Sequence, residues 1–303
     1  MSIRPVRQVL QAQPHVEGAG VKLQRAFGFG KTTEFDPFLL FDDFRNENPA
    51  DYLAGFPWHP HRGIETITYV LRGTVQHGDS LGNRGAMGPG DVQWMTAGSG
   101  ILHQEMPKGD DAGRMHGFQL WANLPKSLKM TDPRYQDILA KDIPEVVDDD
   151  GTRVRVICGE FWGKTGPVEG VAADPRYLDV FVPPGVRKTL PVESSRHAFA
   201  YIFEGSGTFR DASAPRGVLT EQVGEGASGA MVRDEAGNRS LVLFDSGDAI
   251  TVQAGEAGIR FLLVSGRPLE EPVAWRGPIV MNTDEELRRA YAELRDGTFI
   301  RHR

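Results

Sequence analysis

The chain consists largely of short segments in which apolar and polar residues alternate, separated by glycine-rich turns. The segment ETITYVL (65–71) alternates two sets of side chains, and HGFQLWANLP (116–125) places Phe118, Leu120 and Ala122 on one face. A period of two is typical of β-strands. The 36 glycines and 20 prolines favour many turns over long helices. The sequence therefore predicts an all-β fold of antiparallel strands, arranged as sandwiches or barrels.

The strand pattern occurs twice along the chain. YVLRGT at 69–74 resembles YIFEGS at 201–206, and the pattern pauses over 128–150, a stretch with two prolines and three consecutive aspartates that we interpret as a linker. Two similar halves indicate duplication of one β-domain. We expect an N-terminal domain over 1–140 and a C-terminal domain over 141–303.

The C-terminal segment TDEELRRAYAELRDG changes from a strand pattern to a helical one. Thr283 is placed to cap the first turn, acidic residues follow it, and Gly297 lies past the last turn. Apolar residues recur at helical spacing at Leu287, Ala290, Tyr291 and Leu294. The sequence predicts an amphipathic helix over about 283–296.

Charge and cysteine content narrow the class of protein. The net charge is −7 and the sequence pI is about 5.7, so direct binding to nucleic-acid phosphates is not expected. Cys158 is the only cysteine, which favours a reducing compartment. No apolar run approaches the ~18 residues of a membrane helix, and no signal peptide is evident. We expect a cytoplasmic protein without membrane contact.

Histidine is scarce, with 8 in 303 residues, yet two occur together at His59 and His61. In an extended segment, residues i and i+2 project to the same side. His103 and Glu105 repeat this spacing. Two such pairs inside a β-barrel can bind one divalent metal, and nitrogen ligands with a carboxylate suit Fe(II), Mn(II), Co(II), Ni(II), Cu(II) or Zn(II). Coordination positions left open would make the site reactive.

The two segments that carry these pairs resemble the pirin family of the cupin superfamily. They are GFPWHPHRGIETITYVLRG (55–73), with the spacing H-x-H-x3-E-x7-G, and GPGDVQWMTAGSGILHQEMP (88–107). The resemblance is strong over about 37–125 and looser over the whole chain. It implies a bicupin of two β-sandwich barrels, with one metal, usually iron, in the N-terminal barrel. The family's ligands fall on His59, His61, His103 and Glu105.

The remaining candidate residues are assigned to supporting roles. Glu65 lies an even number of residues from His59 and His61, so in an extended chain it would project to the same side. We therefore expect it to point inward and to orient a ligand or water. The second half offers His197 without an HxH pair, so no metal is expected there. His77 is interpreted as a solvated turn residue, with a place at the rim of the pocket as the alternative, and His116 as a core or network histidine. Candidates for the apolar pocket wall are Phe56, Trp58, Met95, Met106 and Met115.

The resemblance implies an oxygenase. Pirins are associated with quercetin 2,3-dioxygenase activity, which would make a flavonol-like aromatic compound and dioxygen the substrates and Glu105 the candidate base. The alternative that the family offers is an iron-dependent, redox-responsive regulator acting through transcription-factor or metabolic-enzyme partners. A metal-dependent isomerase or a different dioxygenase is a third possibility, because fold and site do not fix the substrate.

Overall fold

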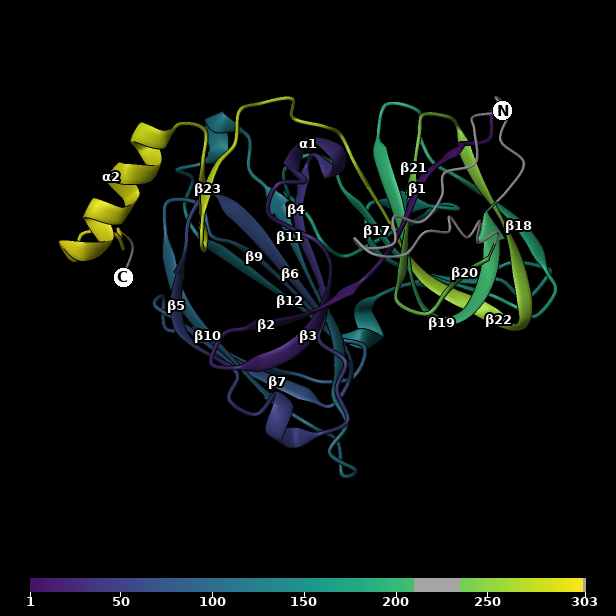
Figure 1. The fold of residues 1–303 in the computed structure, drawn as a ribbon, viewed down its shortest axis with the longest axis horizontal. Coiled ribbons are helices and arrows are strands. Elements are labelled where there is room, and N and C mark those ends of the chain that lie inside the picture. The colour runs from purple at the N-terminus through teal and green to yellow at the C-terminus, as the bar shows by residue number, and fades with distance from the viewer. Residues whose placement is uncertain (210–234, 302–303) are drawn as a thin grey trace, which may run out of the picture. The chain divides into compact units, whose positions relative to one another are not determined.

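The chain forms two compact units. The structure is a computed structural model that describes residues 1–209 and 235–301 (Figure 1). Unit 1 comprises Met1–Ala12, Ile143–Glu169 and Asp174–Pro268, and unit 2 comprises Gln13–Asp142, Gly170–Ala173 and Leu269–Arg303.

Unit 2 contains two antiparallel sheets that lie opposite each other (Figure 1). The seven-stranded sheet has the order β12-β9-β6-β11-β4-β3-β2 and the four-stranded sheet the order β5-β10-β7-β8. The strands of the first are β2 (Gln13–Glu17), β3 (Val21–Phe27), β4 (Phe38–Asp43), β6 (Ile64–Arg72), β9 (Val92–Thr96), β11 (His116–Asn123) and β12 (Arg134–Ile138). The strands of the second are β5 (Phe56–His61), β7 (Thr74–Asp79), β8 (Arg84–Met87) and β10 (Ile101–Lys108).

Unit 1 is built around one nine-stranded antiparallel sheet with the order β1-β21-β19-β22-β17-β14-β13, to which β18 and β20 add at β22 and β19. The pairing of β19 with β22 shifts register twice, and such bulges bend long strands so that the sheet can close over its core. Its strands are β1 (Val6–Gln11), β13 (Glu145–Val147), β14 (Arg153–Cys158), β17 (Arg176–Val182), β18 (Arg187–Pro191), β19 (His197–Phe209), β20 (Ala236–Gly237), β21 (Ser240–Phe244) and β22 (Ala249–Gly266); a hairpin joins β15 (Glu160–Phe161) and β16 (Lys164–Thr165).

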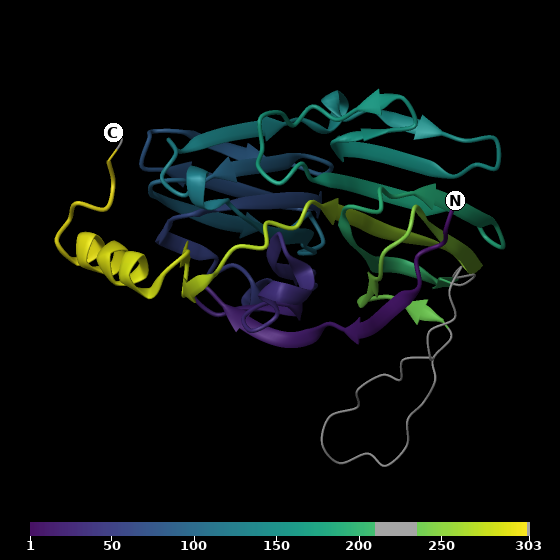
Figure 2. The same cartoon turned by 90° about the horizontal axis from the view of Figure 1, so that it is seen from above.

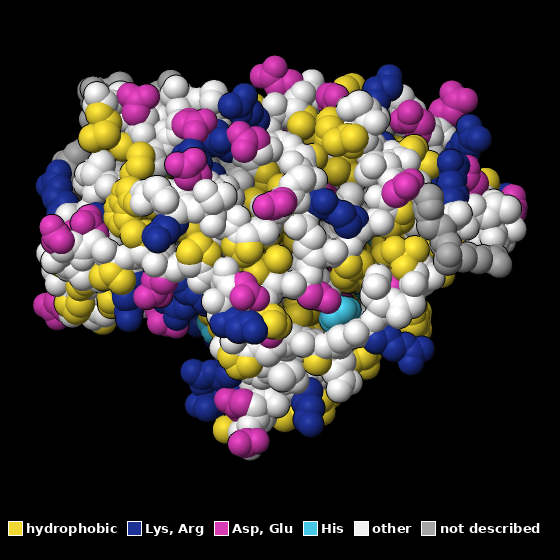
Figure 3. Space-filling model, turned by 180° about the vertical axis from the view of Figure 1, so that it is seen from behind, with side chains coloured by type: hydrophobic (Ala, Val, Ile, Leu, Met, Phe, Trp, Pro, Cys, Tyr) yellow, Lys and Arg dark blue, Asp and Glu magenta, His cyan; other side chains and the backbone are white. Residues whose placement is uncertain are grey.

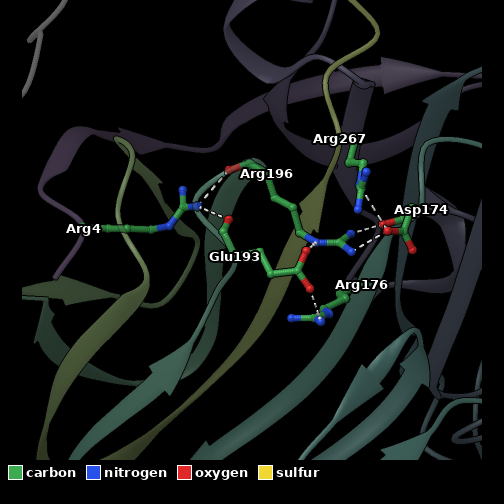
Figure 4. A network of polar contacts seen from close by, with 6 residues as sticks. All are labelled: Arg4, Asp174, Arg176, Glu193, Arg196 and Arg267. Carbon is green, nitrogen blue, oxygen red and sulfur yellow. Dashed lines mark hydrogen bonds and ion pairs between the residues drawn. The ribbon is translucent and has the colours of Figure 1, made fainter. Parts of the chain in front are cut away.

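The N-terminal segment belongs to unit 1 because strand pairing and a buried arginine hold it there. β1 pairs with β21, and the Arg4 guanidinium donates to the carbonyl oxygens of Glu193 at 2.5 Å and Arg196 at 2.9 Å (Figure 4). Ion pairs then connect Glu193 with Arg176 and Arg196, and Asp174 with Arg196 and Arg267 (Figure 4). A buried guanidinium whose two terminal nitrogens donate to carbonyl oxygens fixes the path of this segment.

The C-terminal segment belongs to unit 2. Strands β23 (Ala274–Arg276) and β24 (Ile279–Met281) form a hairpin, and helix α2 (Asp284–Arg295) follows it at the end of this unit (Figure 2). Thr283 and Glu286 form a capping box at the start of the helix. Leu287 and Ala290 pack with the hairpin in a buried apolar cluster. The other helices are short: α1 (Thr32–Phe35), η1 (Pro49–Asp51), η2 (Lys126–Leu128) and η3 (Ala140–Asp142).

The predicted all-β bicupin fold and the C-terminal helix are confirmed. The structure differs from the expected division of the chain at both ends, because Met1–Ala12 packs with unit 1 and Leu269–Arg303 with unit 2. The stretch 128–150 is more than a linker. It contributes β12 to the edge of the seven-stranded sheet and β13 to unit 1, both of which pair through backbone hydrogen bonds that a sequence pattern does not show.

Charges on the molecular surface are mixed where the described residues can be seen. On the face shown in Figure 3, lysine and arginine side chains are interspersed with aspartate and glutamate, and hydrophobic side chains lie between them. None of the helices in residues 1–209 and 235–301 has the length and hydropathy needed to cross a membrane.

Candidate metal centre

Three histidines converge inside unit 2 from two neighbouring strands. β5 ends with His59 and His61, and β10 pairs with it so that His103 lies opposite His59. Possible ligand atoms of the three residues lie within 4.8 Å of one another, and the Nε2 atoms of His59 and His61 are 3.1 Å apart. His61 and His103 are buried. The same-side spacing seen in the sequence therefore produces a cluster only because the two strands are adjacent.

Each histidine has a partner at Nδ1. His59 Nδ1 donates to the Pro57 carbonyl at 2.9 Å, and His61 Nδ1 donates to the Pro278 carbonyl at 3.2 Å. A carbonyl oxygen only accepts, so these two rings carry their hydrogen on Nδ1 and keep a lone pair on Nε2. His103 Nδ1 lies 3.2 Å from the Tyr135 hydroxyl, and its buried Nε2 has no hydrogen-bond partner among the described residues.

These observations fit a divalent metal. Ligating histidines usually use their second ring nitrogen to bind a partner that fixes the ring. Burial lowers the pKa of His59 and lowers the pKa values of His61 and His103 well below their ordinary range. The rings are therefore neutral, which is the form that binds metal. The Nε2 lone pairs of His59 and His61, together with the unpartnered Nε2 of His103, are a coherent donor set for a metal ion.

Glu105 lies on the same strand as His103 but outside the three-histidine cluster. The pairing of β10 with β5 shifts register between these two residues, so His103 faces His59 while Glu105 faces Phe56. The Thr68 hydroxyl donates to Glu105 Oε1 at 2.9 Å. Burial raises the pKa of Glu105 to about 7.

A cavity of about 610 Å³ opens beside the histidines and Glu105. Both sheets of unit 2 and the β23–β24 hairpin contribute to its wall, which is largely apolar and aromatic. His59, His61 and Glu105 face this cavity, and its other polar or charged lining residues are Glu17, Arg25, Asp42, Thr68 and Gln119. Its principal aromatic lining residues are Phe29, Phe44, Tyr52, Phe56, Trp121 and Trp275. An apolar cavity with a few convergent polar groups is typical of a small-molecule site.

The residues expected to form the pocket wall divide into three groups. Phe56 and Met115 line the large cavity. Trp58 and Met106 instead line a separate outer groove of about 410 Å³, and Trp58 is 52% exposed. Met95 is fully buried in an apolar cluster with Ile64 and is not part of either lining. The structure therefore corrects the expectation for Trp58, Met106 and Met95.

Glu65 is buried but does not line the cavity. Thr68 on the same strand does line it, and alternation along β6 places Glu65 on the opposite face of that strand. The Thr96 hydroxyl donates to Glu65 at 2.8 Å, and burial raises the pKa of Glu65 to about 7. The expected inward direction of Glu65 is therefore corrected. The chain turns at Gly63 between β5 and β6, so the alternation of side chains does not continue from His61 to Glu65.

Two residues near the cluster differ from expectation or were not identified from the sequence. His77 is a buried residue of strand β7 rather than a solvated turn residue. Tyr135, the partner of His103, lies in the stretch interpreted as a linker. The alternation in RYQDI (134–138) is the one sequence signal that could have revealed this strand. His116 begins β11 and packs against Phe118, in agreement with its expected core role.

Two antiparallel β-sandwich units, one enclosing a histidine cluster beside a cavity, define a protein of the bicupin class. The Pirin family model matches residues 20–122, and the model of the Pirin C-terminal cupin domain matches residues 177–300. The chain belongs to the pirin family.

Known relatives extend this similarity over nearly the whole chain. A pirin-like protein of Caulobacter vibrioides is 42% identical over 300 residues, covering 99% of this chain and 100% of that protein. The pirin of Homo sapiens is 38% identical over 284 residues, covering 92% and 88%. The crystal structure of quercetin 2,3-dioxygenase from Acinetobacter baumannii has a TM-score of 0.83 at 30% identity, covering 98% of this chain and 99% of that one.

Proposed function

We propose that this protein is a metal-dependent oxygenase of the quercetin 2,3-dioxygenase type, acting on flavonol-like substrates with dioxygen. The observation that carries the proposal is that His59 and His61 of the three-histidine cluster line one largely aromatic cavity of about 610 Å³ together with Glu105. This volume lies within the range of small-molecule sites. The similarity to a protein named quercetin 2,3-dioxygenase supports the choice of substrate class.

His59, His61, His103 and Glu105 are the proposed ligands of one divalent metal. The donor set of three imidazoles and one carboxylate suits Fe(II), our first choice, and can also accept Mn, Co, Ni, Cu or Zn. A bound metal would supply coordination positions for the flavonol oxygens and for dioxygen. Glu105 can approach the cluster because it lies two residues beyond His103 on β10.

Glu105 is also the proposed base for the flavonol hydroxyl. A base must come within hydrogen-bond reach of the proton it removes, and Glu105 lines the cavity that would hold the substrate. Thr68 Oγ1 lies 2.9 Å from Glu105 and 2.8 Å from Gln119 Oε1, so its single hydrogen cannot serve both acceptors. A proton arriving on Glu105 would relieve this competition, because the carboxyl group could then donate to Thr68.

The cavity wall would hold and shield a planar substrate. Trp121 contacts the edge of the His61 ring with centroids 5.0 Å apart, and it lies 6.0 Å from Trp275 of the β23–β24 hairpin. Phe29 extends this aromatic group at 5.2 Å from Trp275. Aromatic rings at such separations offer flat apolar surfaces against which a flavonol ring system can stack.

The test is anaerobic loading with Fe(II), followed by measurement of oxygen uptake and carbon monoxide release with quercetin. Wild-type protein should consume oxygen and release carbon monoxide in equal amounts. Glu105→Gln should lose this activity, whereas Glu256→Gln, an exposed change in unit 1, should retain it. Iron-loaded protein that leaves quercetin unchanged, and that binds a protein partner in only one iron oxidation state, would contradict the oxygenase and favour the regulator.

A further inference from the structure

The second ring nitrogens of the three clustered histidines have partners of two different kinds. His59 and His61 each donate from Nδ1 to a backbone carbonyl, which no side-chain substitution can remove. The partner of His103 is a side-chain hydroxyl, that of Tyr135, 3.2 Å from Nδ1. A hydroxyl can accept or donate, so the hydrogen of His103 is not fixed by its partner in the way that a carbonyl fixes the other two.

Tyr135 reaches His103 from the opposite sheet. It lies on β12, the edge strand of the seven-stranded sheet, where it pairs with Met95 of β9. His103 lies on β10 of the four-stranded sheet. The Tyr135–His103 contact therefore joins the two sheets at the cluster, and the tyrosine comes from an edge strand that pairs with β9 alone among the described strands.

A second aromatic contact fixes the Tyr135 ring. The ring of His77, on β7, stacks on it with centroids 5.7 Å apart and an interplanar angle of 12°. His77 Nε2 lies 3.6 Å from Asp137, two residues beyond Tyr135 on the same face of β12. The imidazole of His77 is thus held against β12 at two points, and its plane limits how far the phenol can turn.

We propose that Tyr135 is a positioning residue of the metal centre, accepting a hydrogen bond from His103 Nδ1–H and thereby directing His103 Nε2 toward the metal. The buried and unpartnered Nε2 of His103 supports this direction, because a hydrogen on that atom would have no acceptor among the described residues. This role depends on the proposed metal centre and is independent of the proposed flavonol reaction.

Metal binding by the full-length protein tests the proposal. The protein is stripped with a chelator and titrated with Co(II) and with Zn(II) against a competing chelator. Tyr135→Phe removes one oxygen atom and should lower the affinity for both metals by about 10- to 100-fold, as loss of a ligand's hydrogen-bond partner usually does. It should also change the visible absorption of the Co(II) form, which reports ligand geometry. Tyr201→Phe, the same change at a buried tyrosine of unit 1, should alter neither.

A further variant separates the hydroxyl from the packing of the ring. His77→Phe keeps an aromatic ring against Tyr135 and should bind both metals within about threefold of wild type, well inside the loss expected for Tyr135→Phe. In the Zn(II) form, nitrogen-15 NMR should show a slowly exchanging His103 Nδ1–H that Tyr135→Phe makes exchange rapidly. The proposal is overturned if Tyr135→Phe keeps wild-type affinity and spectrum, or if His77→Phe loses as much affinity as Tyr135→Phe. Wild-type protein that binds neither metal would overturn it together with the metal centre, whereas failure of quercetin turnover alone would not affect it.

Discussion

Both units are built from antiparallel strands separated by turns, but their interiors differ. The interior of unit 1 contains one large cluster of aliphatic and phenylalanine side chains, with Phe261, Leu263 and Val180 almost completely buried. In unit 2 two smaller clusters of buried apolar residues, one with Val70 and Met115 and the other with Ile64 and Met95, accompany the cavity that His59, His61 and Glu105 face. The same scaffold thus gives a packed core in one unit and a candidate site in the other.

The difference shows what a β-sandwich needs in order to become a site. Interior strand positions can be apolar, which contributes to stability, or polar and convergent, which costs free energy unless each group finds a partner. In unit 2 the Nδ1 atoms of all three histidines have partners and Thr68 contacts Glu105, while the buried Nε2 of His103 has no partner among the described residues. The candidate site therefore depends on a few polar residues at interior strand positions and on the groups that contact them.

Loss of one clustered histidine should give the largest effect. His61→Ala leaves two of the three imidazoles, and affinity for Fe(II) or Co(II) should fall by more than the roughly 100-fold associated with loss of a supporting group alone. Metal content after reconstitution, measured by elemental analysis, should drop from about one per chain to near zero. His197→Ala makes the matched change in unit 1 and should leave the metal content intact. Equal loss in both variants would mean that the cluster is not the binding site.

Truncation of one phenylalanine in each unit should separate a packed interior from an open one. Phe261→Ala removes a fully buried ring from the unit 1 cluster and should lower the free energy of unfolding by about 3–5 kcal/mol. Phe56→Ala removes a partly buried ring from the cavity wall of unit 2, where no new enclosed void forms, and should cost less than half as much. Urea unfolding measures both. Similar losses would indicate that the cavity wall is as tightly packed as the unit 1 core.

A buried lysine should make the stability of unit 2 depend on pH. The Lys129 ammonium donates to the carbonyls of Gly63 and Val280 and to Asn123, and burial lowers its pKa to about 7. Between pH 7 and the ordinary value of 10.5, the unfolded chain binds the proton more tightly than the folded one, so stability rises with pH. Relative to Lys129→Met, the free energy of unfolding of wild type should increase by at most about 1.4 kcal/mol per pH unit over this range.

The matched lysine in unit 1 should behave differently. Burial opposes the charged form of Lys188, but hydrogen bonds to Asp148 and Asp150 outweigh it and raise its pKa. Both the folded and the unfolded chain keep this proton between pH 7 and about 9. The difference in the free energy of unfolding between wild type and Lys188→Met should therefore not change with pH over this range. Chemical denaturation at several pH values measures both slopes. If the difference in free energy of unfolding between wild type and Lys129→Met does not change with pH, the Lys129 ammonium is better solvated than its contacts indicate.

Local patterns predicted most of the fold and part of the site. The alternation that identified the strands and the i, i+2 pairs at His59 and His103 depend on near neighbours only, and the structure places the three histidines together. The cap at Thr283 is likewise local. The direction of Glu65 could not be predicted by counting from His61, because Gly63 adopts a φ of +76° in a turn where a Cβ atom would overlap the Val280 carbonyl. That constraint comes from a residue more than two hundred positions away.

Features that depend on pairing between distant strands could not be predicted from the sequence. Tyr135 contributes to the cluster because β12 pairs with β9, and nothing in RYQDI indicates which strand it will join or which histidine it will meet. The C-terminal segment supplies the Pro278 carbonyl to His61, although the duplication predicted that this segment would belong to the second domain. The sequence identified the three clustered histidines, whereas the Nδ1 partners of His61 and His103 come from segments assigned to the other domain and to a linker.

The smallest effect should come from the helix that follows this C-terminal segment. Thr283 caps α2 by accepting from the Glu286 backbone N–H at 3.2 Å, and Glu286 accepts in return from the Thr283 N–H at 3.0 Å. Thr283→Ala should cost about 1 kcal/mol and increase hydrogen exchange over 284–295. Thr165→Ala, an exposed change on β16 of unit 1, should have no measurable effect on either quantity. If metal affinity falls together with the cap, then α2 supports the Pro278 contact to His61; unchanged affinity would mean that the β23–β24 hairpin holds that contact without the helix.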